Sequence, residues 1–125
     1  MKYRTRKLIK PEDLNSRGTL FGGQLLKWID EEAAIFAMCQ LSRPEDMQVP
    51  NIVTKAISEI DFKSSAYVGD IIEIGCNLVR FGTTSITLEC EVRNKHTQEI
   101  IVKIDKITFV LLDKRGKPFP HGWIK

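Results

Sequence analysis

The chain contains one long stretch of helical periodicity, and the rest of it has the pattern of strands and turns. Apolar residues recur at helical spacing from residue 20 to residue 41, and Pro44 follows shortly beyond that end. The stretch also contains small residues that would let a sheet backbone approach closely: Gly22, Gly23, Ala33, Ala34 and Ala37. We therefore predict a helix over 20–41 that packs against a sheet, with Lys27, Glu31 and Glu32 facing water.

Strand patterns lie on both sides of this helix. Residues 2–10 alternate basic and other side chains, which is consistent with a first strand whose charge protects a sheet edge. Beyond the helix, four stretches are rich in Val, Ile and Thr and are separated by short turn signals: 51–63, 70–81, 84–94 and 99–112. Links this short exclude repeated βαβ crossovers. The pattern predicts an α+β fold in which an antiparallel meander of about five strands covers one central helix.

Length, charge and cysteine content narrow the class of protein. The chain of 125 residues has the size of one domain, which we place at residues 1–125. A net charge of +3 suits a small anionic ligand and does not require a nucleic acid partner. No apolar run could span a membrane and the first ten residues have no signal-peptide core, so we expect a cytoplasmic protein. Cys39, Cys76 and Cys90 are widely spaced, which predicts buried, reduced thiols rather than a disulfide framework or a zinc site.

The stretch from Asn15 to Asp30 contains the candidate active site. Gly22 and Gly23 come at the start of the helix, where backbone N–H groups lack intrahelical partners and stabilise negative charge, including the oxyanion of an acyl-transfer intermediate. Asp30 follows Gly23 by seven residues, about two turns, and so lies on the same side of the helix. An aspartate at the border of an amphipathic helix and an asparagine in a turn are also ordinary surface residues. Position alone does not separate these interpretations.

Several motifs together resemble those of hotdog-fold acyl-CoA thioesterases, in the acyl-CoA hydrolase branch. The branch has the motif N-x-x-G-x-x-F-G-G and an acidic residue seven positions after the last glycine. The matching residues here are Asn15, Gly18, Phe21, Gly22, Gly23 and Asp30. The likeness continues through IDFKSSAYVGD, FGTTSITLECEV and TFVLLDKRGKP, and so covers nearly the whole chain. It implies a hotdog fold, in which a curved antiparallel sheet wraps around one long helix.

The resemblance also implies a function and an assembly. Proteins of this branch hydrolyse an acyl-CoA thioester to a free fatty or carboxylic acid and coenzyme A, and they form homodimers that often assemble into hexamers. By similarity, Asp30 is the general base or the nucleophile, and Gly22 or Gly23 beside it donates to the oxyanion. Asn15 would come from the other subunit. No metal or other cofactor is expected, since coenzyme A enters only as part of the substrate and product.

A turn later in the chain matches the place where family members hold the nucleotide part of coenzyme A. Its candidate binding residues are Arg80, Gly82, Thr83, Thr84 and Ser85. The glycine would permit close approach, and the other four side chains or amides could donate to phosphate. Many relatives carry a basic residue at the position of Thr83. An ordinary hairpin turn is the alternative interpretation.

Two other functions are compatible with the same fold. Hotdog dehydratases use a histidine on or near the helix, whereas His96 and His121 lie in a late turn and in the tail. A module that binds acyl-CoA without turnover would keep the fold and the cleft, and this is the alternative to a hydrolase. The presence of both Asn15 and Asp30 favours the enzyme.

Overall fold

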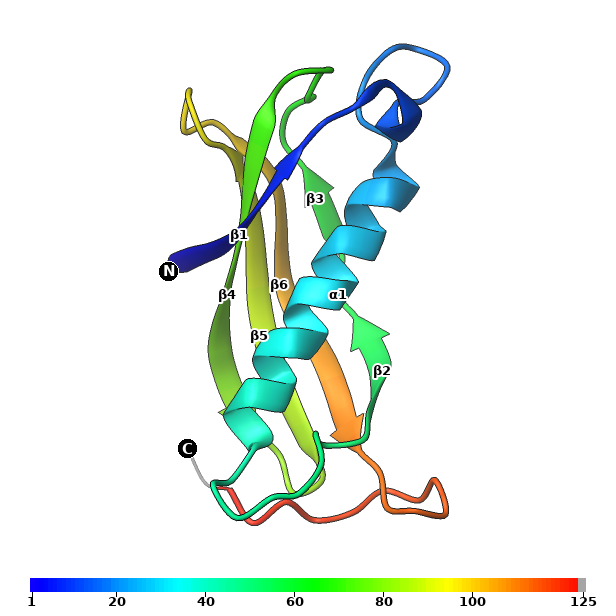
Figure 1. The fold of residues 1–125 in the computed structure, drawn as a ribbon, viewed down its shortest axis with the longest axis vertical. Helices are drawn as coiled ribbons and strands as arrows, with labels where there is room; N and C mark the ends of the chain where they lie inside the picture. Colours follow the sequence, from blue (N-terminus) through cyan, green and yellow to red (C-terminus); the bar gives the residue numbers. More distant parts are fainter. Residues whose placement is uncertain (124–125) are drawn as a thin grey trace.

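In the computed structural model, which describes residues 1–123, one long helix lies across one face of a curved antiparallel sheet (Figure 1). The strands are β1 (Lys2–Leu8), β2 (Ile52–Ile57), β3 (Ile60–Phe62), β4 (Ile71–Phe81), β5 (Ser85–Asn94) and β6 (Ile100–Leu111). A short 3-10 helix, η1 (Pro11–Asp13), follows β1, and the long helix is α1 (Gly22–Leu41). The strand order is β1-β4-β5-β6-β2, with β3 also paired to β6. The predicted α+β architecture is confirmed.

The stretch 51–63 forms two strands rather than one, so the sheet has six strands instead of about five. Both β2 and β3 pair with β6. Between them the Ser58 N–H donates to the Lys106 carbonyl (2.8 Å), and the Ser58 hydroxyl accepts from the Lys106 N–H (3.1 Å). A side-chain oxygen thus takes the place of a backbone carbonyl, and the regular ladder is interrupted there.

The core lies between α1 and the inner face of the sheet. The helix contributes buried apolar side chains at helical spacing: Leu25, Trp28, Ile29, Ala33, Ala37 and Leu41. Alternate strand residues face them and are fully buried, among them Ile72, Ile74, Ile86, Leu88, Val92, Val102, Ile107 and Phe109. Burial of one large apolar side chain contributes roughly 1.5–3 kcal/mol. This packing fixes which side of α1 faces the sheet, and therefore where Asp30 can lie.

Two side chains lie differently from their predicted positions. Glu32 does not face water: it is 9% exposed and accepts a hydrogen bond from the Thr5 hydroxyl (2.6 Å), because β1 reaches this side of α1. Cys39 is exposed on the helix rather than buried. The predicted burial of Cys76 and Cys90 is confirmed, and all three cysteines are free thiols.

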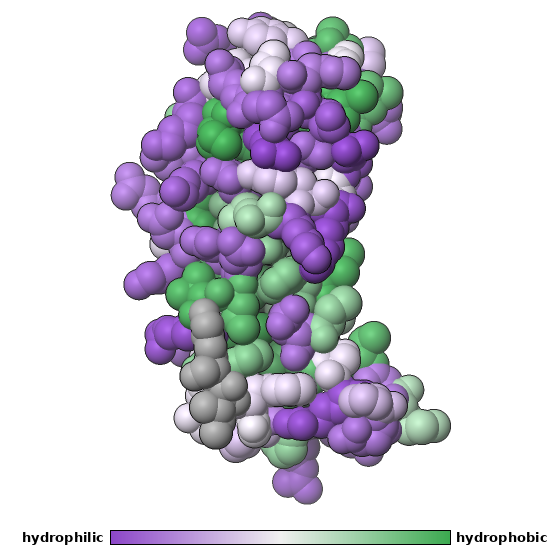
Figure 2. Space-filling model, turned by 90° about the vertical axis from the view of Figure 1, so that its left-hand side faces the viewer, coloured by the Kyte–Doolittle hydropathy of each residue, from purple (hydrophilic) through white to green (hydrophobic). Residues whose placement is uncertain are grey.

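The two edges of the sheet differ in chemistry. At one edge β1 turns Lys2, Arg4 and Arg6 to solvent, as predicted. Figure 2 faces this side of the molecule and shows mostly hydrophilic surface over its upper half. The opposite edge, formed by β2 and β3, exposes apolar side chains: Val53, Ile57 and Phe62. An unpaired edge strand can add a strand from another chain, so this apolar edge is the one suited to self-association.

Candidate active site

The first turn of α1 presents free backbone donors. Phe21 is the N-cap residue with extended backbone, no side chain caps the helix, and the first turn holds no acidic residue. Within residues 1–123, nothing accepts a hydrogen bond from the amide of Gly22 or Gly23. Such amides lie at the positive end of the helix dipole and can stabilise a developing oxyanion. Both predicted donors therefore lie at an open helix N-terminus.

The helix begins at Gly22, two residues later than predicted, because the preceding residues form a small hairpin. Leu14 and Leu20 make an antiparallel bridge, and the Phe21 N–H donates to the Asp13 carbonyl (2.9 Å). These bonds keep the chain extended up to Phe21. The hairpin therefore leads directly into the first turn of α1.

Asn15 is held within this hairpin. Its Nδ2 donates to the Thr19 hydroxyl (2.9 Å), and its Oδ1 accepts from the N–H groups of Arg17 (2.8 Å) and Thr19 (3.2 Å). Gly18 completes the turn with a φ of 81°, which glycine adopts without strain. The amide nitrogen carries a second N–H, so Asn15 can still donate one hydrogen bond outward from a fixed position.

A buried carboxylate ties the hairpin to the helix. Asp13 is 2% exposed, and its two oxygens accept from the Lys10 N–H (2.8 Å) and from the Gln24 side-chain amide (2.9 Å). Gln24 belongs to the first turn of α1. The hairpin that contains Asn15 is therefore tied to the N-terminus of α1, at one end of the molecule (Figure 1).

Asp30 lies two turns further along α1, at the margin of its buried face. The side chain is half-buried, and Oδ1 accepts a hydrogen bond from the Thr54 hydroxyl on β2 (2.9 Å). Oδ2 accepts none from the part of the chain that the structure describes. A carboxylate that is held by one oxygen and free at the other can take a proton from water or attack a carbonyl. Sequence reasoning missed Thr54, which has the pattern of an ordinary β-branched strand residue.

The helix separates Asp30 from the glycines of the same chain. Seven residues at about 1.5 Å per residue place Gly23 and Asp30 roughly 10 Å apart along the axis. Reacting atoms must approach to about 3–3.5 Å, so an oxygen bound by the first-turn amides does not itself contact the Asp30 carboxylate of the same chain. The structure groups Asn15 with Gly22 and Gly23, and Asp30 with Thr54. The expected grouping, which joined the glycines with Asp30 of the same chain, stays a prediction.

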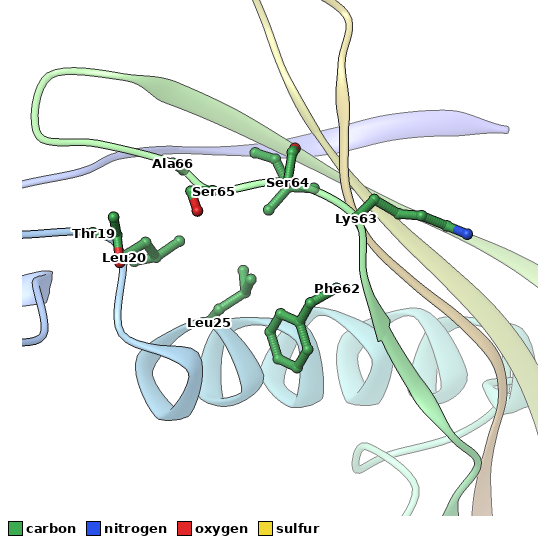
Figure 3. A pocket seen from close by; sticks show the side chains of 9 residues that line it. Thr19, Leu20, Leu25, Phe62, Lys63, Ser64, Ser65 and Ala66 are labelled. Carbon is green, nitrogen blue, oxygen red and sulfur yellow. The ribbon is translucent and has the colours of Figure 1, made fainter. Parts of the chain in front are cut away.

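A pocket of about 280 Å³ lies beside the helix N-terminus (Figure 3). Its lining combines apolar and hydroxyl-bearing side chains: Thr19, Leu20, Leu25, Phe62, Lys63, Ser64, Ser65, Ala66 and Ile101. In Figure 3 Leu25 projects from α1 toward the space and the Phe62 ring borders it. A Cβ atom on Gly22 would lie 3.6 Å from that ring. The pocket therefore adjoins the first-turn donors.

The turn predicted to bind coenzyme A lies at the other end of α1 (Figure 1). The Gly82 N–H donates to the Ser85 carbonyl (2.9 Å), and a Cβ atom at Gly82 would overlap the Ser85 hydroxyl, which would have to rotate away. Arg80 and Thr83 are exposed, whereas Thr84 is half-buried. The five predicted residues therefore do form one hairpin turn, remote from the glycines of their own chain.

His121 holds this turn from the C-terminal segment. Its backbone N–H donates to the Thr83 carbonyl (3.2 Å). The Trp123 N–H donates to its Nδ1 (2.9 Å), so Nε2 carries the ring proton and donates to the Ser85 carbonyl (2.9 Å). Sequence reasoning placed His121 only in the tail. Its contacts make it a structural support of the predicted nucleotide site.

Within residues 1–123, no group of three or more His, Cys, Asp or Glu side chains is arranged to hold a metal ion. In the same residues, no helix is long and apolar enough to cross a membrane.

Known proteins resemble this chain in both sequence and fold. The family model described as the thioesterase superfamily matches residues 17–101. The acyl-CoA thioester hydrolase YciA of Salmonella typhimurium is 32% identical over 121 residues, which cover 92% of this chain and 86% of that protein. The hexameric thioesterase y2039 from Yersinia pestis has a TM-score of 0.82 at 27% identity, over 95% of this chain and 93% of that one.

A third relative has been solved with ligands. The acyl-CoA hydrolase of Staphylococcus aureus, in complex with butyryl coenzyme A, coenzyme A and coenzyme A disulfide, has a TM-score of 0.78 at 30% identity. The match covers 93% of this chain and 66% of that one. Variants of the same enzyme have an aspartate, an asparagine or a threonine replaced by alanine. Sequence and fold agree, and this chain belongs to the thioesterase superfamily, among its hotdog-fold acyl-CoA thioesterases.

Proposed function

We propose that this protein hydrolyses acyl-CoA thioesters to a carboxylic acid and coenzyme A, at sites shared between two subunits. The observation that carries the proposal is the half-buried Asp30, held by Thr54 at one oxygen and free at the other. An uncapped helix N-terminus on the same helix supplies oxyanion donors. Membership of the acyl-CoA thioesterases supports this reaction in particular.

Each site takes its two halves from different chains. A two-fold axis passing α1 midway between Gly23 and Asp30 would bring the partner subunit's Asp30 to the first-turn amides, and the reverse contact would follow by symmetry. One site would then hold Asn15, Gly22 and Gly23 of one subunit and Asp30 and Thr54 of the other. The exposed apolar edge of β2 and β3 supports such a dimer, because Thr54 lies on β2. The hexameric relative supports further assembly into three dimers.

The chemistry follows from this arrangement. The thioester oxygen accepts hydrogen bonds from the Gly22 and Gly23 amides, and Asn15 orients the water or the carbonyl. Asp30 takes a proton from water, whose oxygen bonds to the acyl carbon, or it attacks that carbon itself to give a mixed anhydride that water then opens. In both routes the C–S bond breaks and the coenzyme A sulfur ends with a proton. The pocket beside Leu25 receives the acyl group.

The same geometry selects which turn serves each site. Asp30 lies eleven residues from the end of α1, about 17 Å along the axis, whereas the whole 20-residue helix separates Gly22 from that end by about 30 Å. The turn from Arg80 to Ser85 lies at this end. In a shared site, the turn of the subunit that supplies Asp30 is therefore nearer than the turn of the subunit that supplies the glycines. The nearer turn binds the nucleotide, and the pantetheine arm spans the distance from this turn to Asp30.

The first test measures thiol release from acyl-CoAs of increasing chain length. Asp30→Asn keeps an acceptor for Thr54 but removes the base, and we expect kcat to fall by about 10²–10⁴. An exposed aspartate in a loop, changed as Asp46→Asn, serves as the matched control and should leave the rate unchanged. Tight binding of every acyl-CoA without thiol release by the wild type would instead support the non-catalytic binding module.

The second test assigns the groups to subunits by mixing inactive variants after subunit exchange. Gly22→Pro removes the first amide, and the extended backbone of Phe21 is compatible with a following proline. Gly22→Ala keeps the amide and adds only an ordinary contact with the Phe62 ring, so it should stay active. We expect Asp30→Ala to regain about a quarter of the sites with either Asn15→Ala or Gly22→Pro.

A third mixture tests whether the glycines act with the Asp30 of the partner subunit or with the Asp30 of their own chain. Asn15→Ala mixed with Gly22→Pro should regain nothing, because both changes damage the same half of a site. If the glycines instead served the Asp30 of their own chain, this mixture would recover activity and Gly22→Pro with Asp30→Ala would not. Recovery in that second pattern would reject the proposed assignment of the glycines to one subunit and Asp30 to the other. It would not contradict the proposed thioester hydrolysis.

A further inference from the structure

Two of the cysteines face each other across neighbouring strands, outside the proposed active site. Cys76 on β4 and Cys90 on β5 are directly opposite in the antiparallel pairing, and their Sγ atoms lie 2.9 Å apart. Both are buried beneath α1, with exposed fractions of 5% and 1%. The proposed hydrolysis uses neither thiol. The pair is therefore available for a reaction of its own.

The backbone already suits a covalent bond between these two sulfur atoms. Opposite residues of an antiparallel pair have Cα atoms about 4.5 or 5.5 Å apart, depending on their place in the ladder. Disulfides span Cα separations of about 4.4–6.8 Å, so both kinds of pair fall within their range. The two sulfur atoms need to approach by less than about 1 Å to bond. The strands do not have to move past each other.

We propose that Cys76 and Cys90 form an oxidation site, which hydrogen peroxide converts reversibly into an intrachain disulfide. One sulfur, as its thiolate, attacks a peroxide oxygen, the O–O bond breaks, and a sulfenic acid and water result. The second sulfur attacks the sulfenic sulfur, which forms the S–S bond and releases a second water. The two thiols lose two protons and two electrons in total, and the peroxide is reduced to water. A thiol reductant reverses the bond.

The surroundings set the order of events. The hydrogen bond with Cys76 raises the pKa of the Cys90 thiol, and burial and the carboxylates of Glu32 and Glu89 add to this effect. Cys76 is the slightly more exposed of the two sulfurs and therefore meets the oxidant first. Because Cys90 is already in contact, it captures the sulfenic acid before a second peroxide can.

The test oxidises the folded protein with hydrogen peroxide and maps its thiols. A Cys39→Ser background removes the exposed thiol, leaving two cysteines that trypsin separates by cleavage at Arg80, into peptides 64–80 and 81–93. We expect the two peptides to become joined, the thiols titrated in denaturant to fall from two to none, and dithiothreitol to reverse both changes. Adding Cys76→Ser or Cys90→Ser should abolish the joined peptide.

Three results would overturn the inference. The peptides could stay separate at a peroxide dose that oxidises Cys39 in the wild type. They could join only after unfolding in urea, which would deny any role to the folded geometry. Cys76 could also accumulate as sulfinic acid while Cys90 stays a free thiol. All three are read without the Cys76 and Cys90 serine variants, so poor folding of those variants does not affect the outcome.

Discussion

At the scale of single residues, the hydroxyl of Thr54 decides how the Asp30 carboxylate is held. It donates to Oδ1 (2.9 Å), and a hydrogen bond to a charged group contributes about 1.5–3 kcal/mol. We therefore expect Thr54→Val, which keeps the shape but removes the donor, to lower kcat by about 10- to 100-fold. Thr54→Ser keeps the donor and should retain most of the rate. Equal kcat values for the valine variant and the wild type, at unchanged Tm, would remove Thr54 from the mechanism.

The same residues show what the sequence can and cannot reveal. Gly22, Gly23 and Asp30 stand at a recognisable spacing on one helix, so their positions could be predicted. Thr54 lies 24 residues from Asp30 and becomes its partner only through the packing of β2 on α1. Cys76 and Cys90 did carry a signal, since they are equidistant from Thr83 in the predicted hairpin turn. Equal spacing from a turn predicts a contact only when the two strands pair in register about that turn, and the structure supplies this pairing.

At the scale of elements, Glu73 joins three strands. This carboxylate on β4 accepts from Arg6 on β1 (3.0 Å) and from Arg93 on β5 (3.1 Å). Burial alone would raise the pKa of Glu73, but the two guanidinium groups outweigh it and lower that pKa. The folded state therefore favours the carboxylate, and its stabilising effect is present above the ordinary pKa of about 4.5 and is lost as pH falls further.

A pH series should reveal this contribution. We expect Glu73→Gln to reduce the free energy of unfolding near pH 7, and the difference from wild type to shrink as pH falls below about 4.5. Urea unfolding followed by circular dichroism measures it. The exposed loop variant Glu45→Gln is the control and should show no such pH-dependent difference. A Glu73→Gln deficit that is constant from pH 7 to pH 3 would contradict the assigned charge pairing.

The contact between the C-terminal segment and the β4–β5 turn leads to a prediction about substrate binding. His121→Ala removes the ring donor to the Ser85 carbonyl, so a turn that holds the nucleotide part of coenzyme A should loosen. We expect KM for acyl-CoA to rise about tenfold, or ~1.4 kcal/mol, with kcat little changed. The matching acyl-pantetheine thioester, which lacks the nucleotide, should show no change in KM. Equal effects on both substrates would mean that the turn does not bind the nucleotide.

The boundaries of elements were predictable where local patterns decide them, and not where distant residues do. The apolar repeat and Pro44 located the end of α1, but its start depended on the bridge between Leu14 and Leu20. Glu32 looked solvated on the helical wheel because nothing in its own helix indicates that Thr5 covers it. In both cases a contact from another segment overrode the local pattern.

At the scale of the whole molecule, the apolar edge of β2 and β3 should determine whether active dimers exist. Lysines at Val53 and Ile57 would place charges on this edge, and desolvating them in a dimer is costly. We expect Val53→Lys with Ile57→Lys to yield folded monomers by light scattering, with hydrolysis lost. Met47→Lys adds a charge at a side chain that is 97% exposed and lies in the loop before β2, outside both edge strands, and should leave assembly unchanged. Fully active monomers would show that one chain is sufficient.

Under the proposed division of each site between subunits, the roughly 10 Å that separates Gly23 from Asp30 along α1 would also make the protein vulnerable to inhibition by its own variants. A subunit that carries both Asn15→Ala and Asp30→Ala would damage one half of each site in any dimer it enters. Expressed in excess with the wild type, it would draw normal chains into wholly inactive pairs. Such a subunit would be a dominant-negative inhibitor, whereas either single variant would leave one working site in each mixed dimer.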